Sequence, residues 1–156
     1  MSFMKRTRMK QARIVSVKPV AESGRLSIGW QDGTEDSVDI RDLLGRLKGL
    51  APLRRAATFR RAKVGQWGWS VVWPGRRDIG AETLWRLARE QAGDIMPTQA
   101  FRQWRSTNGL TLDGAAQALG LSRRIVAYYD SGTRMIPKTV WLATMGYDSS
   151  RRKRAA

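Results

Sequence analysis

The sequence predicts an α+β fold: a small antiparallel sheet with helices in an N-terminal domain, followed by an all-α domain. Two observations lead to this prediction. Up to residue 73, apolar residues alternate in short runs, as they do in half-buried strands. After residue 97 they recur every three or four positions, which is the spacing of amphipathic helices. We therefore expect an α+β domain at residues 12–93 and an all-α domain at residues 97–148.

The first predicted elements are three strands and a short helix. Asp32-Gly33 favours a hairpin turn, because both residues tolerate positive φ, and apolar residues alternate on either side of it. Val38 and Ile40 are expected to share one face of the third strand. The strands are predicted at residues 14–20, 26–30 and 34–40, and the helix at residues 42–50.

Two more strands and a helix complete the N-terminal domain. The strands are predicted at residues 58–64 and 68–73, and Leu84, Trp85, Leu87 and Ala88 give residues 81–91 helical spacing. Trp67, Trp69 and Trp73 are expected on one strand face. There they form part of the core or a subunit interface, or less commonly a platform on which bases stack.

Four helices are predicted after a short linker at residues 94–97. Thr98, Thr111 and Ser122 are placed to cap the first three helices, because their side-chain oxygens can accept from free amides. Gly109 and Gly132 are expected to end the first and third helices, and Pro137 begins the fourth. From residue 97 onward the pattern is wholly helical.

The composition argues against most enzyme classes and favours a polyanionic partner. The chain has no cysteine and no histidine, so it lacks thiol nucleophiles, imidazole catalysis and the usual zinc ligands. We predict no enzymatic activity, no cofactor and no metal. A net charge of +16 in 156 residues suits nucleic acid. With no export signal or long apolar run, we expect a cytoplasmic, nucleoid-associated protein without membrane contact.

Residues 111–132 carry the spacing of a helix-turn-helix. Ala116 is small where two helices would cross closely, Gly120 lies in the turn, and Ser122 can cap the second helix. Leu121 and Val126 provide apolar positions in the turn and in the helix after it. The sequence therefore predicts a helix-turn-helix domain.

Residues 98–145 resemble the Cro/C1 (XRE-like) repressor class, through Gly109-Leu110-Thr111, Leu119-Gly120-Leu121-Ser122 and Asp130-Ser131-Gly132. The resemblance implies a DNA-binding domain whose third helix meets base edges. It also implies an ion pair between Arg105 and Asp130. Leu112 departs from the class, in which a phosphate-binding glutamine is frequent there, and Gly114 weakens its helix. The predicted DNA-binding residues are Thr111, Ser122, Arg123, Arg124, Ile125, Tyr128, Arg134 and Lys138.

Residues 12–90 resemble a small bacterial domain of unknown function, family twenty-four forty-two. Trp73-Pro74, Asp78-Ile79 and Glu82-Thr83-Leu84 carry the resemblance. Such domains occur fused to helix-turn-helix modules and are often encoded beside small toxin-like partners. The resemblance therefore implies a role in dimerisation or partner binding.

Both chain ends and one hairpin carry clustered charges. The predicted basic arm (residues 1–11) and basic tail (residues 149–156) either contact DNA backbone or are disordered, solubilising ends. Their cations are Lys5, Arg6, Arg8, Lys10, Arg151, Arg152, Lys153 and Arg154. Five acidic residues near the hairpin are interpreted as solvated charges rather than a magnesium site: Asp32, Glu35, Asp36, Asp39 and Asp42.

These features predict a sequence-specific regulator that binds double-stranded DNA as a homodimer, most simply a repressor or operon autoregulator. The main alternative is an antitoxin-type protein, which binds a small toxin-like protein through its N-terminal domain and autoregulates its operon. A metal-dependent nuclease using the acidic hairpin and an RNA-binding protein are further alternatives.

Overall fold

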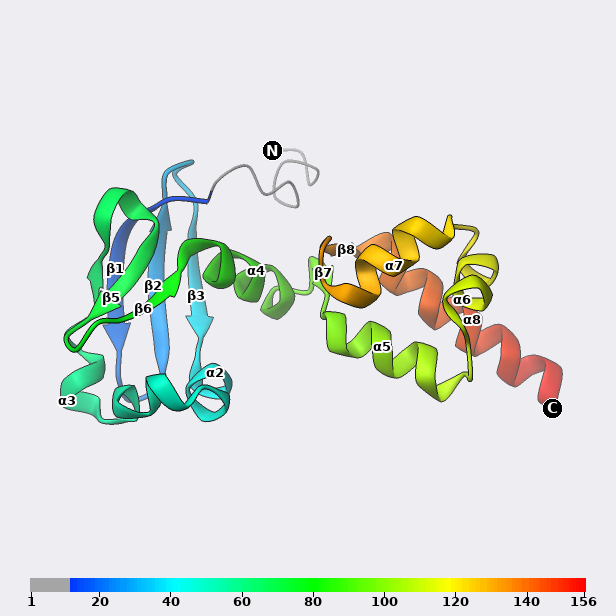
Figure 1. Cartoon of the computed structure of the whole chain (residues 1–156), viewed down its shortest axis with the longest axis horizontal. Helices are drawn as coiled ribbons and strands as arrows, with labels where there is room; N and C mark the ends of the chain where they lie inside the picture. Colours follow the sequence, from blue (N-terminus) through cyan, green and yellow to red (C-terminus); the bar gives the residue numbers. More distant parts are fainter. Residues whose placement is uncertain (1–11) are drawn as a thin grey trace. The chain divides into compact units, whose positions relative to one another are not determined.

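The computed structural model describes residues 12–156, which divide into two compact units between Gln91 and Ala92 (Figure 1). The predicted basic arm, with Lys5, Arg6, Arg8 and Lys10, lies outside the described residues. Antiparallel strands and helices both occur, so the predicted mixture of α and β structure is confirmed.

The N-terminal unit contains two three-stranded antiparallel sheets. In the first, β2 (Arg25–Trp30) lies between β1 (Ile14–Val20) and β3 (Glu35–Asp39). The predicted turn joins β2 to β3, with Gly33 at φ 87°. The second sheet places β5 (Ser70–Trp73) between its partners β4 (Lys63–Val64) and β6 (Arg77–Gly80).

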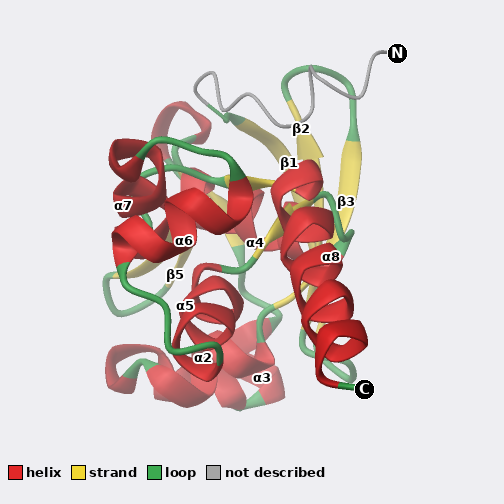
Figure 2. Cartoon of the chain, turned by 90° about the vertical axis from the view of Figure 1, so that its right-hand side faces the viewer, coloured by secondary structure: helices red, strands yellow, loops and turns green. Residues whose placement is uncertain are grey.

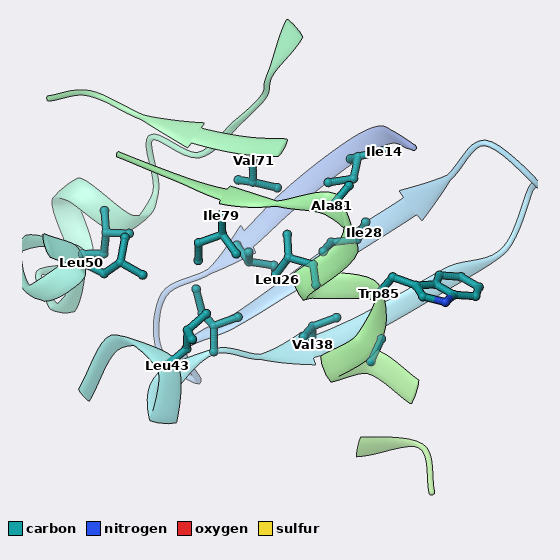
Figure 3. Close-up of a cluster of buried hydrophobic side chains, with 14 of the residues drawn as sticks. Ile14, Leu26, Ile28, Val38, Leu43, Leu50, Val71, Ile79, Ala81 and Trp85 are labelled. Atoms are coloured by element: carbon teal, nitrogen blue, oxygen red, sulfur yellow. The ribbon is translucent and has the colours of Figure 1, made fainter. Parts of the chain in front are cut away.

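One hydrophobic core holds these sheets and their helices together (Figure 3). Leu26, Ile28, Val38, Val71 and Leu84 are fully inaccessible to solvent within it. Burying side chains of this size stabilises the fold by roughly 1.5–3 kcal/mol each. The helices are α2 (Arg41–Arg46), α3 (Ala56–Phe59) and α4 (Ala81–Gln91), with 3-10 helices η1 (Lys48–Arg54) and η2 (Gln66–Gly68).

Three predicted elements of this unit were wrong in kind or extent. Residues 58–64 are not one strand, because Ala56 and Ala57 start the short helix α3, which ends at Phe59. The helix expected at residues 42–50 breaks at Leu47, where the backbone is extended, before η1 begins. The strand expected from residue 68 starts at Ser70, because Trp67 and Gly68 both adopt positive φ in a tight turn.

The C-terminal unit contains four helices within residues 92–156. These are α5 (Thr98–Thr107), α6 (Leu112–Leu119), α7 (Arg123–Ser131) and α8 (Lys138–Ala155), which reaches the C-terminal end (Figure 2). Phe101, Val126 and Ile136 are fully buried in a second hydrophobic core. Among the helices of residues 12–156, none combines the length and apolar character that a membrane crossing requires.

The structure corrects three details of this unit. It is not wholly helical, because β7 (Ile95–Met96) pairs with β8 (Ile136–Pro137), so the predicted linker is partly a strand. Pro97, not Thr98, is the N-cap of α5, and no side chain caps that helix. Finally, α8 begins after Pro137 as predicted but continues through most of the predicted basic tail.

Candidate nucleic-acid interface

Three local features that the sequence predicted define the ends of α6 and the start of α7. The Thr111 Oγ1 accepts from the Gly114 amide at 3.0 Å and caps α6. Gly120 follows α6 in the left-handed conformation, at φ 67°. The Ser122 Oγ then accepts from the Ile125 amide at 3.2 Å and caps α7. Both hydroxyl groups still have a proton that they can donate to a phosphate oxygen.

One face of α7 is anchored in the core. Val126 is inaccessible to solvent and Tyr129 is buried, as predicted, and small Ala115 and Ala116 are buried with them. Burial raises the pKa of the Tyr129 phenol, and the positive charge of Arg134 opposes this shift. This anchoring leaves the other face of α7 free to contact a ligand.

At the exposed side of α7, two arginines lie beside one tyrosine. Arg124 Nε donates to the Tyr128 hydroxyl at 2.9 Å. The Arg134 guanidinium lies 4.9 Å from the centre of the Tyr128 ring, a cation–π distance. Both arginines are exposed, and Tyr128 is half-buried between them. The structure thus brings three of the predicted site residues together.

Arg123, at the first position of α7, is exposed and pairs with Asp113 of α6. The distance from Arg123 Nε to Asp113 Oδ1 is 3.2 Å, and about two thirds of each side chain is exposed. Sequence reasoning missed this partner, because the two residues lie in different helices. The pair holds Arg123 weakly, since exposed ion pairs contribute roughly 0–1 kcal/mol.

The predicted pair of Arg105 and Asp130 is confirmed. Arg105 Nε lies 2.9 Å from Asp130 Oδ1, and Arg105 also donates to the Leu110 carbonyl at 3.0 Å. Arg102 donates to the backbone carbonyl of Asp130 at 2.6 Å. Two arginines of α5 therefore hold the C-terminal end of α7.

Two other predicted site residues have different surroundings. Ile125 is half-buried and packs against the second core, which limits its predicted contact with a thymine methyl group. Lys138 is exposed as the first residue of α8. Leu112, which replaces the expected glutamine, also packs against the second core.

The predicted basic tail is part of α8 as far as Ala155. Arg151 donates to the Asn108 side-chain oxygen at 2.7 Å, at an open pocket of about 400 Å³. Arg152, Lys153 and Arg154 are exposed on the last turns of the helix. Their positions on a helix argue against the disordered end, one of the two alternatives for these residues.

The acidic hairpin is only partly a set of solvated charges. Asp36 is mostly buried: its carboxylate accepts from Trp30 Nε1 at 2.7 Å and pairs with Arg89, whose side chain is 1% exposed. Hydrogen bonds from Arg41 hold the pKa of Asp39 below its usual value. Among residues 12–156, no three His, Cys, Asp or Glu side chains are grouped to bind a metal ion.

The three tryptophans expected on one strand face are separated by the turn at η2. Trp73 is buried, whereas Trp69 is 42% and Trp67 is 72% exposed. A Cβ on Gly68 would lie 2.3 Å from the Ile14 carbonyl oxygen, so this turn approaches β1 too closely for any other residue. The structure therefore assigns only Trp73 to the core.

Comparison with known proteins identifies both the N-terminal unit and a relative of the whole chain. Residues 14–90 match the family described as "Protein of unknown function (DUF2442)". No curated protein matches the chain. A crystal structure from Nitrosomonas europaea ATCC 19718, described as a "Putative DNA Binding Protein", matches with 35% identity and a TM-score of 0.53. The match covers 90% of this chain and 88% of that one.

The chain belongs to the family of this Nitrosomonas protein. Its N-terminal unit carries the DUF2442 match, which confirms the resemblance seen in the sequence. Because the similarity covers 90% of the chain, it extends beyond the DUF2442 unit into the helices of the C-terminal unit. The similarity to the Nitrosomonas protein therefore spans both units.

Proposed function

We propose that this chain is a sequence-specific regulator of transcription, which binds double-stranded DNA with α7. The main observation behind the proposal is the arrangement of α7: this helix is capped, one of its faces is packed in the core, and its other face is basic. Val126 and Tyr129 are buried, while Arg123 and Arg124 are exposed at the first turn. The resemblance to Cro/C1 repressors supports the same role for this helix. The description of the Nitrosomonas relative supports DNA binding in general.

In the proposed mechanism, the protein occupies an operator in the cytoplasm and carries out no chemical reaction on the DNA. Arg123 and Arg124 have the planar fork that pairs with guanine O6 and N7 in the major groove. Thr111 and Ser122 donate their hydroxyl protons to phosphates beside the two helix N-termini. Arg134, Lys138 and the exposed cations at the end of α8 add salt-dependent affinity.

The test is direct binding of the purified full-length chain to duplex DNA from its own promoter. In fluorescence anisotropy with scrambled duplex as competitor, we expect the promoter to bind at least about 10³-fold more tightly. Equal affinity for promoter and scrambled duplex over a salt series would contradict the proposal. Preference for RNA over duplex DNA would contradict it as well.

Replacing Asp113 by asparagine is expected to tighten DNA binding about twofold to fivefold. Its carboxylate pairs with Arg123 and, at the predicted interface, repels phosphate. The measurement is the dissociation constant for the promoter duplex at fixed salt. Glu82→Gln is the matched control, because it removes an exposed negative charge from α4 of the other unit. An equal gain from both variants would show that only net charge matters.

We also propose that the regulator is a homodimer paired through the exposed Trp67 and Trp69. One helix-turn-helix reads too few base pairs to define an operator, so such proteins usually bind two half-sites. Tryptophan is enriched at the energetic centres of interfaces, and Trp67 is held outward in a left-handed backbone conformation.

Replacing Trp67 by alanine is therefore expected to weaken self-association at least about tenfold. Sedimentation equilibrium over a concentration series measures this effect. Leu142→Ala is the matched control, because Leu142 is 55% exposed on α8 in the other unit. Loss of the dimer in the Leu142 variant but not in the Trp67 variant would contradict the proposed interface. A monomeric wild type would contradict the dimer itself.

A further inference from the structure

Positive charge is distributed very unevenly within the N-terminal unit. Residues 41–77 contain ten Lys and Arg but one acidic residue, Asp42. The other described residues of the unit, 12–40 and 78–91, contain five Lys and Arg against eight acidic residues. The whole positive balance of this unit therefore comes from one segment.

The fold gathers much of this segment at one end of the strands. There α2 and α3 lie together, joined by η1 (Figure 1). Arg77 Nε donates to the Gly49 carbonyl at 3.2 Å, which brings the turn between β5 and β6 to η1. Trp73 Nε1 donates to the Phe59 carbonyl at 3.0 Å and fixes α3 beside β5. We call this surface the basic end; its cations are Arg46, Lys48, Arg54, Arg55, Arg60, Arg61, Arg76 and Arg77.

Some cations of the basic end have structural partners, whereas others have no acidic partner in the part of the chain that the structure describes. Arg54 donates to the Leu44 and Gly45 carbonyls, and Arg60 pairs with Glu22 at 2.9 Å. In contrast, four exposed cations have no acidic partner among residues 12–156: Lys48, Arg55, Arg61 and Arg76. Unpaired like charges on one surface repel one another, and a polyanion relieves that repulsion.

We propose that the basic end is a second DNA-binding surface, which contacts the phosphate backbone of duplex DNA. Most of its cations are arginines, whose fork matches phosphate oxygens. Within residues 41–59 the exposed large apolar side chain is Leu47, which lies between α2 and η1. Protein interfaces, in contrast, are centred on buried apolar and aromatic groups. The surface lies in a different unit from α7, and it adds affinity without sequence preference.

The test is the salt dependence of binding by the full chain to a scrambled duplex. The slope of log K against log salt is negative, and each lost phosphate contact reduces its magnitude by about 0.9. The triple variant Lys48→Gln/Arg55→Gln/Arg61→Gln is therefore expected to reduce the magnitude of that slope by about two to three. Lys18→Gln, an exposed cation on β1 outside the basic end, is expected to leave the slope unchanged.

Two further variants distinguish this site from α7. Arg55→Lys/Arg61→Lys keeps the charge and is expected to keep the slope. The triple variant lowers affinity for promoter and scrambled duplex alike, whereas changes in α7 alter the preference between them. If the triple variant and the wild type had the same salt slope on scrambled duplex, the inference would be overturned. An acidic protein would then be favoured as the partner of the basic end. This result does not depend on whether α7 reads sequence.

Discussion

Replacing Asp36 by alanine is expected to lower the free energy of unfolding by about 3–5 kcal/mol. Asp36 is the acidic partner of Arg89, whose side chain is 1% exposed, and it also accepts from Trp30 Nε1. Its loss leaves a buried guanidinium charge without its counter-charge, which is among the costliest changes in a protein interior. Urea unfolding followed by tryptophan fluorescence measures the effect.

Glu35→Ala is the matched control for this prediction, because Glu35 is exposed and directly precedes Asp36 in β3. Its effect is expected to stay within about 0.5 kcal/mol. The double variant Asp36→Leu/Arg89→Met removes both charges and is expected to recover most of the loss. Equal unfolding free energies for the two alanine variants would show that the Asp36–Arg89 pair contributes nothing.

Replacing Arg123 and Arg124 together by alanine is expected to reduce the preference for promoter over scrambled duplex at least about tenfold. A well-formed contact between arginine and a guanine edge contributes roughly 1–3 kcal/mol of discrimination. Both side chains are exposed, so little stability should be lost. Competition binding at constant salt measures the preference.

Arg152→Ala/Arg154→Ala is the matched control, since it removes the same charge from the exposed end of α8. This variant is expected to bind both duplexes more weakly and to keep the preference between them. If the two double variants had the same effect, α7 would contribute charge but no base recognition.

Local chemistry made the ends of α6 and α7 predictable. A threonine or serine before a helix and a glycine after it act within a few residues, so Thr111, Gly120 and Ser122 have their predicted roles. The inward positions of Val126 and Tyr129 follow from helical spacing alone.

Three of the errors arose where residues far apart in the sequence determine the structure. Ile95 and Met96 form a strand only because β8 pairs with them, some forty residues later. Asp36 is not a solvated hairpin charge, because Arg89 reaches it from α4. The turn at Trp67 depends on the close approach of Gly68 to Ile14, which no alternation pattern reveals.

The most direct test of the central claim maps DNA contacts onto the chain by NMR. Uniformly ¹⁵N-labelled protein is titrated with its promoter duplex, and amide shifts are followed for residues 12–156. The proposed function predicts that the largest changes fall at Thr111 and from Ser122 to Tyr128, with smaller changes at Lys48, Arg55 and Arg61. Changes confined to the N-terminal unit, with α7 unaffected, would contradict the claim that this helix reads DNA.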